Sequence, residues 1–346
     1  MANLKNIDRS AANSNKAVVI SGAAVILLFF ISLSIGKFRL SIWDILEILS
    51  GIHGNEMAVK VFFGLRLPRN IMALMAGMGL GVAGNIFQSI FKNPLASPDI
   101  IGVTSGASAG AAFCIVFLSG GIFAITFGAF LGGIIAISFV IGLVRLSRTR
   151  DIKTYVLSGI VINAISNGTI MTLKYFADPE KELGAIEFWA MGSLGGITLE
   201  KLSKVLPFFC AGIIGIYLFR WTISILSLSD EEAGALGVNV GQSRFLILLL
   251  STLTVASIIC VTGLISFVAL ISPHVARAIV KRNSFKATLL SGLLGSILMI
   301  ISDCLARSLL YSELPVSIIT SFIGAPYLAV LVGRKRWSMG EKYESQ

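Results

Sequence analysis

The chain has 346 residues, of which 55% are hydrophobic and only 13% are charged, and its formal net charge is +10. Soluble proteins carry about 25% charged residues, so this composition excludes a pair of ordinary soluble domains. The excess of Lys and Arg would suit a nucleic-acid-binding protein if the cations covered one solvated face. Here they are clumped between long apolar runs, which indicates an integral membrane protein without a nucleic-acid partner.

Charge-free runs along the chain predict the membrane spans, because a helix needs about 20 apolar residues to cross the hydrocarbon core. In chain order the runs are 17–36, 70–91, 100–144, 154–173, 205–226 (interrupted by Arg220), 245–276, 287–302 and 314–333. The run 100–144 is long enough for two helices, with a break predicted at Ser119-Gly120-Gly121.

The run 245–276 is short for two spans, and the positive-inside rule decides how it is divided. If it held one helix, Arg334-Lys335-Arg336 would lie on the outer side, against that rule. We therefore predict a break at Thr262-Gly263 and a short eighth helix that ends near Val280.

The predicted fold class is an all-α integral membrane protein with about ten transmembrane helices. We expect a cytoplasmic tail at 1–16, a permease-like membrane domain at 17–333 and a cytoplasmic tail at 334–346. With both termini inside, the whole net charge of +10 falls on the inner side. The charge is thus an orientation signal for a multi-pass protein of the cell membrane.

Two enzyme-like strings occur within the apolar runs. Gly79, Gly81 and Gly84 fit GxGxxG, but no strand precedes them, so close helix packing is the favoured interpretation. Ser108 fits the GxSxG elbow of serine hydrolases, which also needs a strand-to-helix turn and a nearby histidine. The chain has two histidines, His53 and His274, and neither belongs to a recognisable triad.

The four cysteines stand singly in apolar runs, so we expect packing thiols and neither a metal nor another cofactor. The sequence also has no P-loop, so it does not bind ATP by that motif. An ion-coupled carrier would place ionisable groups inside its spans. Asp303 is the one strong candidate, and Arg307 follows it by one helical turn, where an ion pair is favoured over a proton relay.

The segment 226–244 has the pattern of a short capped helix. Ser229 and Glu232 form a capping box, acids fill the first turn, and Gly237 suits a left-handed C-terminal cap. A second short helix is expected to follow. Such a pair is too short to be stable alone, so it is either an ordinary loop or a surface that another protein holds.

Proline-containing motifs at the span edges complete the pattern. Arg66-Leu-Pro-Arg69 is followed by Gly84, Gln88, Asn93-Pro-Leu-Ala-Ser-Pro98, Gly102 and Gly106-Ala107. The second half contains Gly263-Leu-Ile-Ser-Phe-Val, Pro273-His274, Asp303-x-Leu-Ala-Arg307, Glu313-Leu-Pro315 and Gly324-Ala-Pro326. Over about residues 60–335 this order resembles the FecCD-type permeases of iron-siderophore and cobalamin ABC importers.

The resemblance implies a type II ABC importer permease that moves a ferric siderophore, haem or cobalamin and does not catalyse ATP hydrolysis itself. Its implied partners are two cytoplasmic ATP-binding subunits, a second permease subunit, an extracytoplasmic binding protein and membrane lipid. An ion-coupled or facilitative secondary transporter is the alternative function. The implied ATPase-coupling residues are Ser229, Asp230, Glu231, Glu232, Ala233, Ala235, Leu236 and Gly237.

The resemblance also implies a binding-protein docking site at Arg66, Arg69 and Arg307 on the outer side. In the family the fifth helix lines the translocation path, which here corresponds to 154–173. Asn163, Ser166 and Asn167 form one polar stripe on that predicted helix. The stripe faces either a water-filled path or polar groups of neighbouring helices, and the sequence leaves both open.

Overall fold

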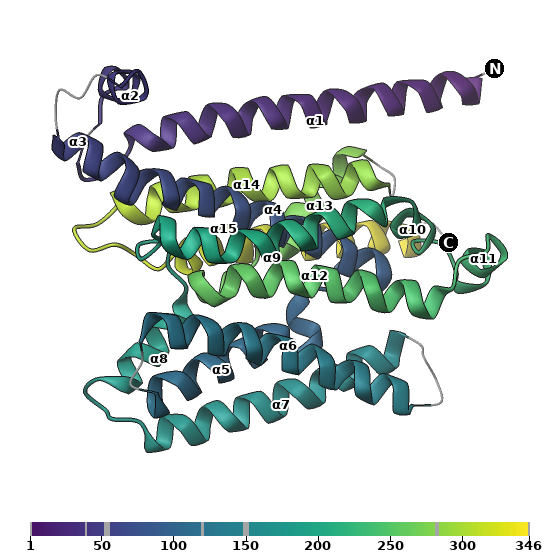
Figure 1. Cartoon of the computed structure of the whole chain (residues 1–346). Coiled ribbons are helices and arrows are strands. Elements are labelled where there is room, and N and C mark those ends of the chain that lie inside the picture. The colour runs from purple at the N-terminus through teal and green to yellow at the C-terminus, as the bar shows by residue number, and fades with distance from the viewer. Residues whose placement is uncertain are drawn as a thin grey trace.

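The computed structural model describes residues 2–38, 40–51, 56–118, 121–147, 152–280 and 284–344. Within these ranges the secondary structure is entirely helical (Figure 1). The elements of the first half are α1 (Ala2–Ser34), α2 (Ile42–Leu49), α3 (Glu56–Val61), the π-helical turn η1 (Phe62–Arg66), α4 (Leu67–Ile90), the 3₁₀ turn η2 (Pro98–Ile101), α5 (Val103–Phe117), α6 (Ile122–Leu146) and α7 (Ile152–Phe176). The second half contains α8 (Glu182–Met191), α9 (Leu199–Leu218), α10 (Arg220–Ile225), α11 (Asp230–Ala235), α12 (Val240–Thr262), α13 (Val268–Val280), α14 (Phe285–Ser308) and α15 (Val316–Glu344).

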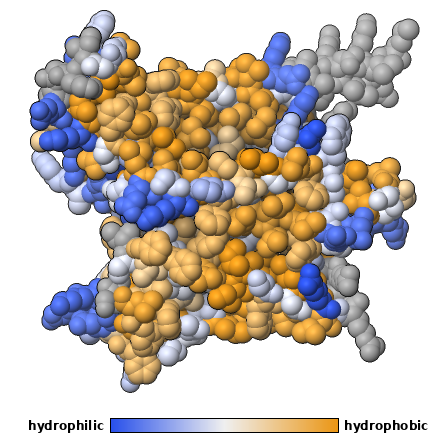
Figure 2. Space-filling model, in the orientation of Figure 1, coloured by the Kyte–Doolittle hydropathy of each residue, from blue (hydrophilic) through white to orange (hydrophobic). Residues whose placement is uncertain are grey.

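Among the described residues, seven helices are long and apolar enough to cross a membrane, and three shorter apolar helices accompany them. The shorter ones are Val103–Phe117, Val268–Val280 and Val316–Leu331. The surface between the two ends of the bundle is broadly apolar, and the polar side chains gather toward the ends (Figure 2). This pattern is expected of a protein whose sides face lipid.

The two predicted breaks are confirmed, because separate helices flank each of them. In the run 100–144, α5 ends at Phe117 and α6 begins at Ile122. In the run 245–276, α12 ends at Thr262 and α13 begins at Val268. The intervening backbone includes Phe267 with φ 67°, a conformation that is rare for a bulky side chain.

The two tails that we expected as separate regions are helical where described. Helix α1 begins at Ala2, so residues 2–16 continue directly into the first apolar helix. Helix α15 runs to Glu344, past the predicted end of the membrane domain at 333. The short helices α2, α3 and α8 were not predicted, because each is shorter than the window that a membrane span requires.

Helix α4 lies at the centre of the bundle and packs on α14, α12 and α13. Its glycines allow this close approach. A Cβ at Gly81 would overlap the carbonyl oxygen of Ser291 on α14, and one at Gly84 would overlap that of Ala269 on α13. Gly79 faces the side chain of Ile258 on α12. The packing interpretation of the GxGxxG string is therefore confirmed.

Helices α5 and α6 form a second closely packed pair. A Cβ at Gly106 would overlap Ala136 and one at Gly110 would overlap the carbonyl oxygen of Gly128. Gly102 caps the start of α5 with φ 75° and faces Ile162 of α7. The Ser108 hydroxyl donates to the Thr104 carbonyl at 2.9 Å, within its own helix. His53, weighed with Ser108 as a catalytic partner, lies outside the described residues.

Candidate functional site

Helix α11 stands at one end of the bundle, which we call the α11 end (Figure 1). Its capping box is confirmed. The Ser229 amide donates to Glu232 Oε2 at 2.9 Å, and the Glu232 amide donates to Ser229 Oγ at 3.1 Å. Gly237 has φ 80°, and the bonds Val238 N to Ala233 O and Gly237 N to Gly234 O form the predicted left-handed cap.

Most of this segment is exposed. Ala233 is buried to 1% exposure, whereas the other predicted coupling residues lie on the surface: Ser229, Asp230, Glu231, Glu232, Ala235, Leu236 and Gly237. The hydrogen bonds of Ser229 lower the pKa of Glu232 below its ordinary value. Three acids and the exposed apolar Leu236 thus share one small surface that is fixed at both ends.

The second short helix that we expected after Gly237 is absent as a separate element. The backbone instead enters α12 at Val240, with the Asn239 side chain accepting from the Gln242 amide at 3.1 Å. The polar residues 239–244 therefore form the first turns of a long helix. A sequence pattern cannot separate these two cases, because both begin with the same capping residue.

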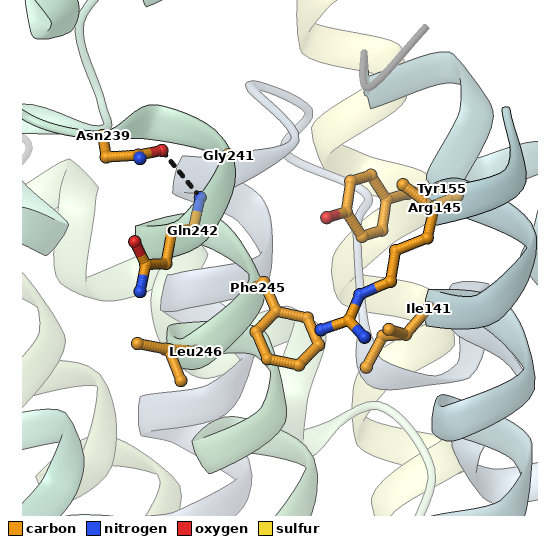
Figure 3. A pocket seen from close by; sticks show the side chains of 9 residues that line it. Ile141, Arg145, Tyr155, Asn239, Gly241, Gln242, Phe245 and Leu246 are labelled. Atoms are coloured by element: carbon orange, nitrogen blue, oxygen red, sulfur yellow. Dashed lines mark hydrogen bonds between the residues drawn. The ribbon is translucent and has the colours of Figure 1, made fainter. Parts of the chain in front are cut away.

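A recess of about 490 Å³ adjoins the start of α12 (Figure 3). Its lining includes Asn239 and Gln242 on one side and Arg145 and Tyr155 on the other. The Arg145 guanidinium lies 5.0 Å from the centroid of the Phe245 ring, within the range of a cation–π contact. The recess therefore presents both hydrogen-bonding groups and a cation at the start of α12.

The three predicted docking arginines lie at the opposite end, which carries α2 and which we call the α2 end. Arg69 Nε is 2.8 Å from Asp303 Oδ1, and its Nη1 is 2.8 Å from Glu313 Oε2. Arg307 Nη2 donates to the Ser32 carbonyl at 2.8 Å, and Arg66 donates to the carbonyls of Ile35 and Phe38. All three arginines are buried.

The predicted Asp303–Arg307 ion pair is present, with Arg307 Nε 3.5 Å from Asp303 Oδ2. Arg69 is nevertheless the closer partner of Asp303, and this contact was missed because the two residues lie in distant helices. The contacts of these arginines therefore connect α1, α4, α14 and the loop before α15. A cavity of about 680 Å³ beside Arg307 opens between this cluster and residues 34–44.

The predicted polar stripe on α7 is divided between different surroundings. Asn163 Nδ2 donates to the Asp99 carbonyl at 3.1 Å, and its Oδ1 accepts from the Ser105 hydroxyl. Ser166 is buried, while Asn167 is exposed. The polar side chain of Asn163 is thus satisfied by hydrogen bonds to neighbouring elements, whereas Asn167 alone of the three is exposed on the surface. The Asp99 contact was missed by the sequence reasoning, because η2 gives no periodic signal.

No group of three or more His, Cys, Asp or Glu residues that could hold a metal ion occurs in the described part of the chain. The FecCD transport family model matches residues 24–334. The molybdate import permease MolB of Haemophilus influenzae is 35% identical over 332 residues, covering 92% of this chain and 95% of MolB. The iron(3+)-hydroxamate import permease FhuG of Bacillus subtilis is 32% identical and covers 92% of this chain and 98% of its own.

A solved structure described as an inward-facing metal-chelate type ABC transporter superposes with a TM-score of 0.83. It is 33% identical and covers 92% of this chain and 99% of its own. Members of this family are non-catalytic permeases, and their ATP hydrolysis lies in a separate subunit. The chain therefore belongs to the FecCD transport family and is a multi-pass inner-membrane permease of an ABC importer that works with ATPase subunits and another permease.

Proposed function

We propose that this permease carries a ferric siderophore or a similar iron chelate into the cytoplasm. The observation that carries ATP-driven import is α11, a helix capped at both ends whose first-turn acids are exposed at the end of a membrane bundle. The FhuG and metal-chelate relatives support an iron chelate, and MolB makes molybdate the competing cargo. The described residues offer no metal-ligand cluster, which fits a cargo that crosses with its chelator in place.

The test is uptake by proteoliposomes that contain this chain together with its ATPase and a binding protein. We expect radioactive ferric siderophore to enter only when ATP is inside with the ATPase, and labelled molybdate to stay outside. Uptake driven by a membrane potential without ATP would instead indicate a secondary transporter. ATP-dependent entry of molybdate alone would assign the other cargo.

We further propose a topology of ten spans with the α11 end and both termini in the cytoplasm. Seven long and three shorter apolar helices support this number, since a short helix spans when irregular backbone completes it inside the protein. In a variant without native cysteines, Leu236→Cys should react with a membrane-impermeant thiol reagent only from the inside, and Trp43→Cys only from the outside. The reverse labelling would invert the topology.

The proposed assembly has two permease copies, identical or paralogous, two ATP-binding subunits and one extracytoplasmic binding protein. Helix α7 supports a permease–permease contact, because the polar Asn167 is exposed on it among large apolar side chains such as Leu157 and Met171, and a polar side chain facing lipid is unfavourable. Native mass spectrometry of the purified complex should give this composition. A permease that stays a single copy in the active complex would contradict it.

We propose that the binding protein docks at the α2 end and that Arg66, Arg69 and Arg307 take part. Arg69 already holds the half-exposed Glu313, so a carboxylate of the binding protein would exchange with this partner. Replacing each arginine by lysine keeps the charge but removes the paired donors, and should weaken docking while its salt dependence stays the same. Unchanged affinity in all three variants, with unchanged thermal stability, would refute this role.

We propose that Asn167, with Asn163 and Ser166 behind it, borders the translocation path. Its exposure on a mostly apolar helix supports this, because a polar side chain facing lipid is unfavourable. A water-soluble thiol reagent should label Asn167→Cys in the assembled complex and should spare the buried Ser166→Cys. Labelling that is lost when the lipid composition alone changes would place Asn167 at the lipid surface.

A further inference from the structure

Asp230, the first residue of α11, contacts one cation on α12 and one in the turn that follows α4. Nη2 of Arg244 on α12 lies 2.9 and 3.0 Å from the two carboxylate oxygens. Nζ of Lys92, directly after α4, lies 3.4 Å from Asp230 Oδ1. One carboxylate at the α11 end therefore joins three separate parts of the chain.

The two contacts differ in how firmly they hold. The Arg244 side chain is 1% exposed, its Nη2 binds Asp230, and its buried Nε has no hydrogen-bond partner among the described residues, so the charge of this guanidinium is compensated through Asp230. Lys92 and Asp230 are 38% and 49% exposed, and such a pair is weak and screened by salt. The Arg244 contact therefore fixes Asp230 to α12, whereas the Lys92 contact can break and form again.

The backbone of Lys92 gives a second, independent indication that its side chain is used. Lys92 has φ 48°, in the left-handed region, where glycine is the usual residue when a helix ends in this conformation. The bonds Lys92 N to Ser89 O and Asn93 N to Gln88 O complete this cap, and neither needs a side chain. A lysine is strained here relative to glycine, and its side chain reaches Asp230.

Lys92 also begins the irregular segment between α4 and α5. The chain passes through Asn93-Pro94 and η2, and it enters α5 at Gly102. Within this segment the Asp99 carbonyl accepts from Asn163 of α7, the first residue of the polar stripe. A displacement at Lys92 is thus passed through about ten residues of connected backbone to the helix that we propose borders the path.

We infer that the Lys92–Asp230 contact is the switch through which α11 acts on the segment 92–102. This inference rests on the proposed function, in which α11 receives the motion of the ATPase. Arg244 positions the carboxylate, and Lys92 binds or releases it as α11 shifts. Lys92 and Asp230 are positioning residues for transport, since neither needs to touch the cargo.

The experiment measures cargo transported per ATP hydrolysed by the complete complex in proteoliposomes. Lys92→Gln should lower this ratio about two- to fivefold, which is the range that a partly exposed ion pair supplies. Lys92→Gly should lower it as much while leaving the thermal stability equal or higher, because glycine relieves the strained backbone. Lys92→Arg should keep the wild-type ratio, and so should Lys16→Gln, which removes an exposed cation from α1.

A double-mutant cycle separates this pair from the Arg244 contact. Adding Lys92→Gln to Asp230→Asn should lower the ratio no further than Asp230→Asn does alone. A wild-type ratio in Lys92→Gln or Lys92→Gly would overturn the inference and leave the proposed function intact. If the wild-type chain shows no ATP-dependent uptake, the proposed function itself fails.

Discussion

The Nε atom of Arg69 lies 2.8 Å from Oδ1 of Asp303, although 234 positions separate the two residues in the sequence. The pair joins the central helix α4 to α14 in a place where Asp303 is fully buried. Arg307 approaches the same carboxylate from one turn further along α14. Asp303 therefore compensates two buried guanidinium groups.

Replacing Asp303 by Asn should destabilise the fold by about 3–5 kcal/mol, because it leaves buried arginine charge uncompensated. Chemical denaturation in detergent measures this difference. Glu313→Gln is the matched control, since this carboxylate also binds Arg69 but is 39% exposed. The control should lose about 0–1 kcal/mol. Equal losses in the two variants would mean that Asp303 is not the central partner.

Gly84→Ala should lower stability by about 1–3 kcal/mol, since the new methyl group overlaps the Ala269 carbonyl and the helices must separate. The thermal midpoint of the purified chain reports this change. Gly168→Ala on α7 is the control, because nothing lies within 4 Å of a Cβ there. That variant should be neutral or slightly stabilised. A stable Gly84→Ala protein would show that α4 and α13 pack less closely.

Ala233→Pro should separate ATP hydrolysis from transport. The Ala233 amide donates to the Ser229 carbonyl at 2.9 Å, and proline removes this bond from a six-residue helix. Transport and ATP hydrolysis are measured together in the reconstituted complex. Ala233→Gly is the matched control, because it keeps the amide that donates to Ser229 and should retain most of the coupling. Normal uptake by Ala233→Pro would argue against a coupling role for α11.

The contribution of Asp230 should depend on pH in acid only. Burial tends to raise the pKa of Asp230, but the hydrogen bonds and charge of Arg244, with Lys92, hold it below the ordinary 3.8. A lowered folded-state pKa stabilises the fold above the unfolded value and loses that effect as the pH falls through the folded value. The stability difference between wild type and Asp230→Asn should be constant from about pH 5 to 8 and shrink below about pH 4.

Thermal unfolding in detergent across this range measures the difference. Glu231→Gln is the control on the same helix, because Glu231 forms no ion pair with the described residues. Its difference from wild type should be small at each pH. If the stability difference between wild type and Asp230→Asn grew larger in acid, the pKa of Asp230 would be raised in the folded protein, and its pairing with the cations would be refuted.

The long apolar helices, both predicted breaks and the α11 caps were predictable, because each depends on residues close together in the sequence. Gly237 and the Ser229–Glu232 pair illustrate this, since a cap is specified within a few positions. The Asp303–Arg307 pair was found for the same reason. The closer contact of Arg69 with the same carboxylate was not predicted, because α4 and α14 meet only in the tertiary structure.

The short helices escaped prediction for a different reason. Helix α2 packs Ile45 and Ile48 inward and leaves Ile42, Trp43 and Leu46 exposed. Its acids Asp44 and Glu47 stand three positions apart, which is a helical pattern, but eight residues are too few for a span, so the criterion of long apolar runs does not detect it. The separate second helix after Gly237 was wrong because an N-terminal cap carries no information on the length of the helix that follows.

Between α3 and α4 the π-helical turn η1 has hydrogen bonds from residue i to residue i+5, so this turn contains one residue more than an α-helical turn. Residues 56–90 form one continuous helical stretch, yet the two parts face different neighbours. Ala58 and Phe62 pack with α2, whereas the residues after Arg66 pack into the main core. An α-helical turn elsewhere in this stretch cannot take up an extra residue, so an insertion there would rotate the outer part by about 100° about the axis. The wide turn at η1 takes up one residue locally, which keeps the outer cap in phase with the membrane core. Deleting one residue within η1, such as Gly64, should therefore disturb the contacts of that cap less than deleting one from α4.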